Sequence, residues 1–286
     1  MIDRVVGQPM DQSSPLRIGA VRYLNARPLT YRLSELAPEA ELVLDVPSRL
    51  ADALRAGRLD VGLIPSVEYF RAGCYSIVPG IAIAARGPVR SVKLYSRCAL
   101  DEIGTLALDV GSRTSAALAQ IWLARAYGVR PDVEPLPLGV PPEATTADAV
   151  LAIGDRGMFP APAGVFRHEV DLAEAWLELT GLPFVFAIWA VAPDVDLGAV
   201  EAAFHQAKRE GLAAVHAIAR QATVELGLPF EDCLRYLTCN ICYDLTEPEL
   251  RGLNLFYRWA RELELVPDGV ELKFYDRANL AEVSSG

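Results

Sequence analysis

The chain has 286 residues, of which 52% are hydrophobic and 22% charged, and its net charge is −10. A chain of this length and apolar content can bury a substantial core, arranged as one large or two modest domains. The acidic balance argues against nucleic acid or an anionic membrane as a partner, because both require a basic surface. An anionic ligand would have to be attracted locally, by backbone N–H groups and a few arginines.

The cysteines and the N-terminus indicate the compartment. Five scattered cysteines, an odd number, are typical of reduced thiols rather than of a disulfide framework. Residues 1–14 lack the basic start and apolar core of a signal peptide, and we interpret them as a flexible N-terminal tail. The longest apolar stretch, Leu182 to Ala192, is too short to span a bilayer. We expect a cytoplasmic protein without a membrane partner; the sequence predicts no oligomeric state.

Short strands and helices alternate along the first third of the chain. The unit that begins at Pro47 is the clearest: apolar residues recur at helical spacing up to Gly57, and Asp60–Ile64 follows as a short buried strand. Pro65-Ser66 then ends the strand and opens a second helix, an arrangement at which open α/β proteins bind ligands. The elements expected here are strands at 16–20, 41–46, 60–64, 77–85 and 92–96, and helices at 28–36, between 48 and 57, and from 67.

A second alternation begins at Thr105 and gives way to helices after Pro193. Two α/β runs followed by a helical tail predict an α/β fold with two lobes and a ligand cleft between them. We expect the chain to cross near residues 96–101 and 190–194, so that lobe I holds residues 15–98 and 192–286 and lobe II residues 99–191. The expected elements are strands at 105–109, 133–136, 149–153 and 184–191, and helices at 114–127, 171–179, 200–220, 230–237 and 248–263.

Polar turns at strand ends and helix starts are the candidate binding segments. Gly111–Ser115 is the strongest candidate for an anion, since it combines a glycine, hydroxyl side chains and Arg113 at a helix N-terminus. The same residues can also be ordinary helix caps, and both roles stay open. The spacing matches neither GxxxxGK[ST] nor GxGxxG, so no nucleotide loop is predicted. The other turns are Tyr23–Asn25, Pro65-Ser66, Val89–Ser91 and Gly154-Asp155.

Acidic and histidine side chains do not form a recognisable catalytic set. Asp155 can cap a helix, accept from a hydroxyl or act as a general base, and capping is the commonest role for Asp in such a turn. His205 and His216 lie on one predicted helix without an HExxH pattern, and nothing in the sequence orients His168. We expect all three histidines to be surface or packing residues.

The pair Cys239 and Cys242 has CxxC spacing. A structural zinc needs four ligands, and no second pair or nearby histidine completes the set. We therefore predict no metal and no cofactor. The residues alone predict a two-lobed anion binder and leave catalysis open.

Six motifs follow one another between Arg17 and Trp189. They are RIGAVRYLNARPL (17–29), PSRLADALRAGRLDVGLIPSVEY (47–69), GPVRSVKLYS (87–96), GSRTSAALAQIWL (111–123), LAIGDRGM (151–158) and DLAEAWLELTGLPFVFAIW (171–189). Taken together, they resemble the chorismate dehydratases of the futalosine route to menaquinone. The SRTS turn and TGLPFVFAIW are the most distinctive of these segments.

The resemblance implies a fold similar to the periplasmic binding proteins of the second structural type, with two α/β lobes around a cleft, in a cytoplasmic enzyme. Its reaction removes water from chorismate and gives 3-[(1-carboxyvinyl)oxy]benzoate. Because this elimination makes the ring aromatic, the protein chiefly needs to hold two carboxylates and position the scissile groups. A carboxylate of the substrate serving as the base would account for the missing side-chain base.

The resemblance also implies site residues. Asn25 matches the active-site asparagine, whose amide can hold the leaving hydroxyl or the enolpyruvyl carboxylate. Asp155 stays a candidate, although Arg156-Gly157 replaces the small apolar pair usual in the family after that turn. The positions implied to bind substrate are Ser66, where relatives vary, and Ser91, Ser112, Arg113, Thr114 and Ser115.

Two other functions remain open at this stage. A non-catalytic protein that binds small carboxylates would share the lobed fold, and we expect such a protein to carry a signal peptide or a fused partner domain. The paralogous dihydroxynaphthoate synthase of the same route also shares the fold. The SRTS and TGLPFVFAIW motifs argue against the synthase.

Overall fold

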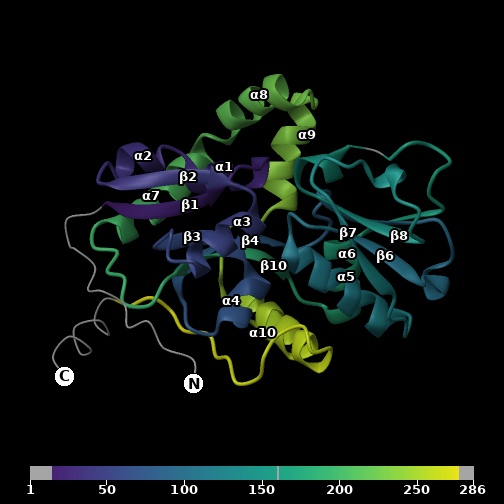
Figure 1. The fold of residues 1–286 in the computed structure, drawn as a ribbon. Coiled ribbons are helices and arrows are strands. Elements are labelled where there is room, and N and C mark those ends of the chain that lie inside the picture. The colour runs from purple at the N-terminus through teal and green to yellow at the C-terminus, as the bar shows by residue number, and fades with distance from the viewer. Residues whose placement is uncertain (1–14, 160, 277–286) are drawn as a thin grey trace.

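The computed structural model describes residues 15–159 and 161–276, so the predicted tail at 1–14 lies outside the described residues. Two five-stranded mixed sheets make up its framework, with β1–β3 on the left and β6–β8 on the right of Figure 1. The first sheet has the order β2-β1-β3-β10-β4 and the second the order β7-β6-β8-β5-β9. The strands of the first sheet are β1 (Leu16–Val21), β2 (Ala40–Asp45), β3 (Val61–Pro65), β4 (Ser76–Ala85) and β10 (Phe184–Val191).

The centre of the first sheet is the predicted unit around Pro47. Helix α3 (Pro47–Arg55) has proline at its first position, buries Leu50 and Leu54, and is followed by Gly57 at φ +66°. Strand β3 comes next, buried along its whole length, and α4 (Ser66–Ala72) begins immediately after it. These elements agree with the sequence prediction to within one or two residues. They bring Pro65 and Ser66 to the end of a buried strand.

Strand β10 lies between β3 and β4 and is antiparallel to both. All eight of its residues are buried, which explains its uninterrupted apolar sequence. By contrast β1, β2 and β3 run parallel. The first sheet is therefore completed by a strand that follows β3 in the chain by more than a hundred residues.

The second sheet repeats the α/β pattern. Strand β6 is parallel to β7 and β8, whereas β5 is antiparallel to β8 and β9. Helix α5 (Arg113–Ala126) follows β6, and α6 (Leu172–Thr180) follows β9, a strand that the sequence did not predict. The strands are β5 (Val92–Ser96), β6 (Thr105–Asp109), β7 (Asp132–Leu136), β8 (Ala149–Ile153) and β9 (His168–Asp171).

The chain passes between the sheets earlier than predicted. Since β5 belongs to the second sheet and β10 to the first, the crossings fall at residues 86–91 and 181–183, not near 96–101 and 190–194. The apolar sequences of β5 and β10 predict strands but do not identify the strands with which they pair. The division into two lobes stays a prediction, with its crossings moved to these linkers.

Helices dominate the chain after β10. The predicted helix at 200–220 is two helices, α7 (Val200–Ala213) and α8 (Val215–Leu226), which meet at Ala214. Helix α7 packs on α1 (Arg27–Thr30) and α2 (Leu33–Leu36), two short helices separated by Arg32 at φ 53° where one helix was predicted. Next come α9 (Phe230–Arg235), the π-helical turn η5 (Tyr236–Asn240) and α10 (Glu247–Glu262), which packs on β10. No helix within the described ranges is both long and apolar enough to cross a membrane.

Candidate functional site

A pocket lies where the two sheets meet. Residues of β1, β3, β4 and β10 form one side of it, and Val92 of β5 and Ile153 of β8 lie on the other. It encloses about 480 Å³ of atom-free space, part of which is open solvent. The predicted cleft therefore has a pocket at the junction of the sheets.

The side chains that line the pocket are uncharged. Most are apolar, such as Ile83 and Phe186, and an anion there would meet hydroxyl, amide and backbone N–H donors rather than an arginine. Apolar walls with a few convergent polar groups are typical of small-molecule sites. The polar lining residues are Tyr23, Asn25, Ser91, Ser112 and Ser115.

Asn25 lies in the 3₁₀ turn η1 (Leu24–Ala26), just after β1. Its Oδ1 atom is buried and has no hydrogen-bond partner in the described part of the chain. Buried polar atoms are normally paired, so an unpaired acceptor at the pocket wall is a candidate ligand contact.

Asp155 supports this turn with a hydrogen bond to its backbone. It lies in the 3₁₀ helix η4 (Gly154–Met158) after β8, and its Oδ1 accepts the N–H of Leu24 at 3.1 Å. Burial raises the pKa of the Asp155 carboxyl, and the Leu24 N–H acts against that rise. The structure thus gives Asp155 a capping contact next to Asn25, and Asp155 is not among the residues that line the pocket.

Ser91 is fully buried at the end of the loop that joins the two sheets. The Asp171 carboxylate accepts the N–H groups of Val89 and Arg90 at 3.0 and 2.5 Å, and Arg90 has a left-handed backbone at φ 64°. Gly157 packs against the other side: a Cβ there would lie 2.6 Å from the carbonyl oxygen of Ser91. The backbone that leads to Ser91 is therefore held by Asp171 at the end of β9, and Ser91 itself packs against Gly157 of η4.

Residues far along the chain hold the same loop. The Tyr236 hydroxyl donates to Ser91 Oγ at 2.8 Å, and the Asn240 side-chain amide donates to the carbonyl oxygen of Pro88 at 2.7 Å. The sequence did not predict Tyr236 as part of the site. The feature that marks Tyr236 as a candidate site residue is structural. Tyr236 begins a π-helical turn, and such turns are frequent at functional sites.

The turn at Gly111–Ser115 opens α5 next to the pocket. Ser112 is the N-cap of α5, its Oγ accepting the Ser115 N–H at 3.4 Å, and the two hydroxyl oxygens lie 2.9 Å apart. The capping role that the sequence left open is therefore present. Both serines also line the pocket, beside the N-terminus of a 14-residue helix whose free N–H groups favour an anion.

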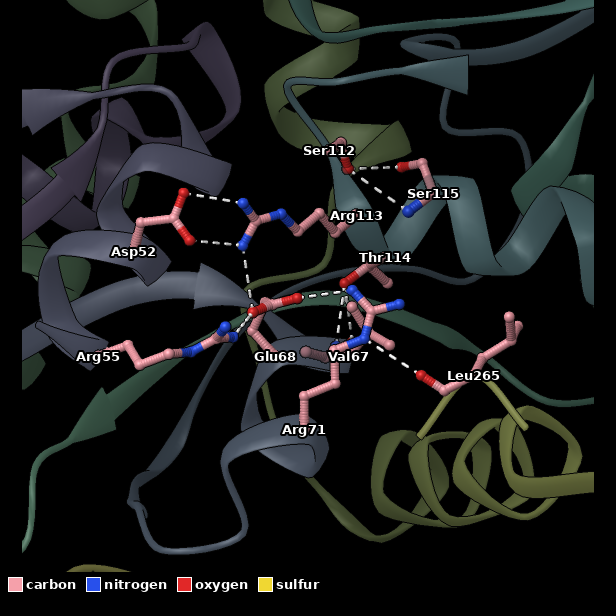
Figure 2. A network of polar contacts seen from close by, with 11 residues as sticks. Asp52, Arg55, Val67, Glu68, Arg71, Ser112, Arg113, Thr114, Ser115 and Leu265 are labelled. Atoms are coloured by element: carbon pink, nitrogen blue, oxygen red, sulfur yellow. Dashed lines mark hydrogen bonds and ion pairs between the residues drawn. The ribbon is translucent and has the colours of Figure 1, made fainter. Parts of the chain in front are cut away.

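Arg113 is not among the residues that line this pocket, and its guanidinium joins α5 to α3 and α4 (Figure 2). Its Nη1 and Nη2 bond to the two carboxylate oxygens of Asp52 at 2.9 and 2.8 Å, and Nη1 lies 3.2 Å from Glu68 Oε2. The Glu68 carboxylate is almost completely buried and also binds Arg55 and Arg71. The guanidinium of Arg113 is thus occupied by carboxylates of α3 and α4.

Thr114 and Ser66 are buried just behind the turn. Thr114 Oγ1 accepts the N–H of Val67 at 3.1 Å, and Ser66 Oγ donates to the carbonyl oxygen of Val185 at 2.8 Å. The structure therefore brings four predicted residues together at the pocket and gives Ser66, Arg113, Thr114 and Asp155 contacts inside the protein. A direct role of those four in binding stays a prediction.

Tyr23 lines the pocket; the sequence placed it in a candidate binding turn but gave it no role of its own. Burial, and then the nearby Asp109 carboxylate, raise the pKa of Tyr23 to about 12, so the phenol is neutral at neutral pH. Asp109, at the end of β6, accepts the N–H of Gly111 at 2.8 Å and forms an ion pair with Arg156. Arg156, whose presence departs from the family pattern, thereby fixes the turn that precedes α5.

The other candidate groups lie away from the pocket. Within the described ranges, no group of three or more His, Cys, Asp or Glu side chains is placed to hold a metal ion. All five cysteines are free thiols. His168 is the first residue of β9, and His205 and His216 lie on α7 and α8 rather than on one helix.

The fold is similar to that of solved structures with low sequence identity. A protein from Archaeoglobus fulgidus has a TM-score of 0.68 at 20% identity, over 90% of this chain and 100% of that chain. A Candida albicans protein described as having the generic periplasmic binding protein fold has a TM-score of 0.59 at 14% identity, over 95% of each chain. The α/β fold of the periplasmic-binding-protein type, predicted from the motifs, is confirmed.

The sequence relationships are more specific than the fold. The chorismate dehydratase of Thermus thermophilus is 32% identical over 262 residues, which cover 85% of this chain and 94% of that protein. A family model described as menaquinone biosynthesis matches residues 16–262. The chain therefore belongs to the menaquinone biosynthesis family and is a homologue of chorismate dehydratase.

Proposed function

We propose that this protein is a chorismate dehydratase, a hydro-lyase that converts chorismate to 3-[(1-carboxyvinyl)oxy]benzoate in the futalosine route to menaquinone. The observation that carries the proposal is the relative named chorismate dehydratase, whose similarity extends over 94% of its own length. The uncharged pocket at the junction of the sheets supports it, since four of the residues implied by the motifs line that pocket. We also propose a cytoplasmic location, which the five free thiols support.

The proposed reaction is an elimination that needs no external reagent. The C–O bond to the ring hydroxyl breaks, a neighbouring C–H loses its proton, the ring becomes aromatic, and one water leaves. Formation of the aromatic ring drives the reaction. The protein therefore contributes by orienting the substrate and by excluding other reactions of chorismate. We propose that a carboxylate of the substrate takes the proton, because no carboxylate, histidine or lysine lines the pocket in the described part of the chain.

We propose a specific division of work among the polar residues. Asn25 contacts the leaving hydroxyl through its amide, whose Oδ1 lacks a partner in the described residues. Ser91 donates a hydrogen bond to one substrate carboxylate, and the second carboxylate lies at the N-terminus of α5, beside Ser112 and Ser115. These neutral donors bind the two carboxylates of chorismate. They do not stabilise the bound substrate so strongly that turnover is slowed.

Incubation of the purified protein with chorismate tests the proposal. We expect a new aromatic absorbance and a product lighter than chorismate by one water, identified by mass spectrometry. Asn25→Ala under identical conditions controls for spontaneous breakdown of chorismate. Binding of chorismate without any product would favour the non-catalytic carboxylate-binding alternative, and absence of both would refute the assignment.

A further inference from the structure

We infer that Tyr236 is a positioning residue of this site: its hydrogen bond to Ser91 fixes the direction in which the Ser91 hydroxyl donates into the pocket. The inference rests on the proposed function, because it names the acceptor as a carboxylate of chorismate. It concerns a residue of the helical tail that lies 145 positions from Ser91 in the sequence.

The contact between the two hydroxyls is shielded from water. Tyr236 and Ser91 are each 1% exposed, and the oxygens lie 2.8 Å apart. A hydrogen bond in such an environment does not exchange with solvent, and leaving either group unpaired would be costly. Burial keeps Tyr236 protonated, since it raises the pKa of the phenol above its usual value and leaves the proton available for the bond to Ser91.

The direction of the bond determines what Ser91 can offer a ligand. Tyr236 has one hydroxyl proton and donates it to Ser91 Oγ. A serine hydroxyl has one proton and two lone pairs, so Ser91 keeps its own proton for another acceptor. Because Ser91 lines the pocket, that acceptor is a ligand atom, and a carboxylate oxygen makes the strongest such bond.

Asn25 completes the arrangement. Asn25 lies close enough to act on the pKa of the Tyr236 phenol, and its Oδ1 has no hydrogen-bond partner among the described residues. The pocket thus presents a hydrogen-bond donor at Ser91 and an unpaired acceptor at Asn25, and Tyr236 determines the role of Ser91.

Tyr243 provides a matched control from the same stretch of chain. It is also a buried tyrosine, but its hydroxyl has no hydrogen-bond partner in the part of the chain that the structure describes. Tyr243 does not line the pocket. Loss of the hydroxyl at position 243 therefore changes polarity in the same region, near Tyr236, without removing the hydrogen bond to Ser91.

The test compares Tyr236→Phe, Tyr243→Phe, Ser91→Ala and the Tyr236→Phe/Ser91→Ala double variant. For Tyr236→Phe we expect KM and the calorimetric Kd for chorismate to rise about three- to tenfold, the equivalent of one hydrogen bond, with kcat within about twofold. In the Ser91→Ala background the same change is expected to have less than about a twofold effect, because the two residues act through one contact. Tyr243→Phe is expected to leave all three constants unchanged.

The outcomes separate this inference from the proposed function. A purely structural role would lower the melting temperature and the active fraction while leaving KM unchanged, and that result, or full additivity with Ser91→Ala, would overturn the inference but leave the activity standing. If the unmodified protein binds chorismate without converting it, the proposed activity is refuted. The Kd values of the variants then still decide whether Tyr236 and Ser91 act through one contact. A protein that does not bind chorismate would overturn both.

Discussion

Arg113 and Asp52 form a two-pronged ion pair that ties the start of α5 to α3, with nitrogen–oxygen distances of 2.9 and 2.8 Å. The same guanidinium reaches the buried Glu68, so one side chain of α5 joins the two helices α3 and α4. An arginine in a hydroxyl-rich turn is typical of an anion site, yet here the protein itself supplies the anions. These ion pairs hold the start of α5 against α3 and α4.

Replacing Arg113 distinguishes a structural role of its ion pairs from a role in binding the substrate. We expect Arg113→Gln to lower the free energy of unfolding by about 1–3 kcal/mol, the range for hydrogen bonds with charged groups, and to change KM for chorismate less than about threefold. Urea unfolding and steady-state kinetics measure both quantities. Arg125→Gln is the control, since Arg125 lies on the same helix and pairs with Glu262 away from the pocket. A tenfold rise in KM at unchanged stability would instead assign Arg113 to the substrate.

The second prediction concerns Asn25. We expect Asn25→Ala to lower kcat about a hundredfold or more, because an amide that contacts the leaving hydroxyl acts mainly in the transition state. His168→Gln is the comparison, and we expect less than about a tenfold change, below the usual contribution of a general base. The measurement is kcat with chorismate at saturation. Loss of turnover in a folded His168→Gln, with Asn25→Ala still active, would require acid–base catalysis by histidine.

Gly157 is expected to be intolerant of any side chain. Alanine at this position would place its Cβ 2.6 Å from the carbonyl oxygen of Ser91, so the Ser91 backbone would have to move. We expect Gly157→Ala to raise KM for chorismate about tenfold or more, since displacing one buried bond to a charged ligand costs about 1.5–3 kcal/mol. Gly87→Ala, in the loop that carries Ser91, is the control because a Cβ there meets open space. Equal KM values for the two variants would contradict the prediction.

The ion pair of Asp60 with Arg17 predicts an acid-dependent stability. Burial would raise the pKa of Asp60, but bonds of 2.6–3.0 Å from Arg17 outweigh it, and the pKa is lowered. The unfolded chain therefore binds more protons, so the stabilisation is present above the usual Asp pKa of about 4 and is lost as pH falls through the folded value. Urea unfolding between about pH 5 and pH 3 should show a weaker pH dependence for Asp60→Asn than for the unmodified chain. Identical slopes would refute this assignment.

Local sequence patterns predicted most of the individual elements. Strands β4 and β8 and helices α3 and α10 begin and end within two residues of the predicted positions, because each has its own apolar period and its own end signals. The motifs also identified Asn25 and Ser91, which line the pocket. The predicted single helix at 28–36 was wrong because Arg32 adopts a left-handed backbone, which no residue there signals.

Long-range pairings were beyond the reach of those patterns. The apolar sequence of β10 predicts a buried strand but not the sheet to which it belongs. Only its pairing with β3 and β4 shows that it belongs to the first sheet. Tyr236 escaped notice for a related reason, since a lone tyrosine in a helical tail has no neighbours that mark it. The contacts that orient Ser91 arise from the tertiary fold.

The position of β10 has a consequence for how the protein is made. Until residue 191 has left the ribosome, β3 and β4 cannot be joined, and each presents an unpaired edge of backbone N–H and C=O groups. A nascent chain that ends before β10 therefore contains the other four strands of the first sheet without the strand that joins β3 to β4. Such distant pairings slow folding, which makes the interval before β10 emerges the period in which this chain most needs protection from aggregation.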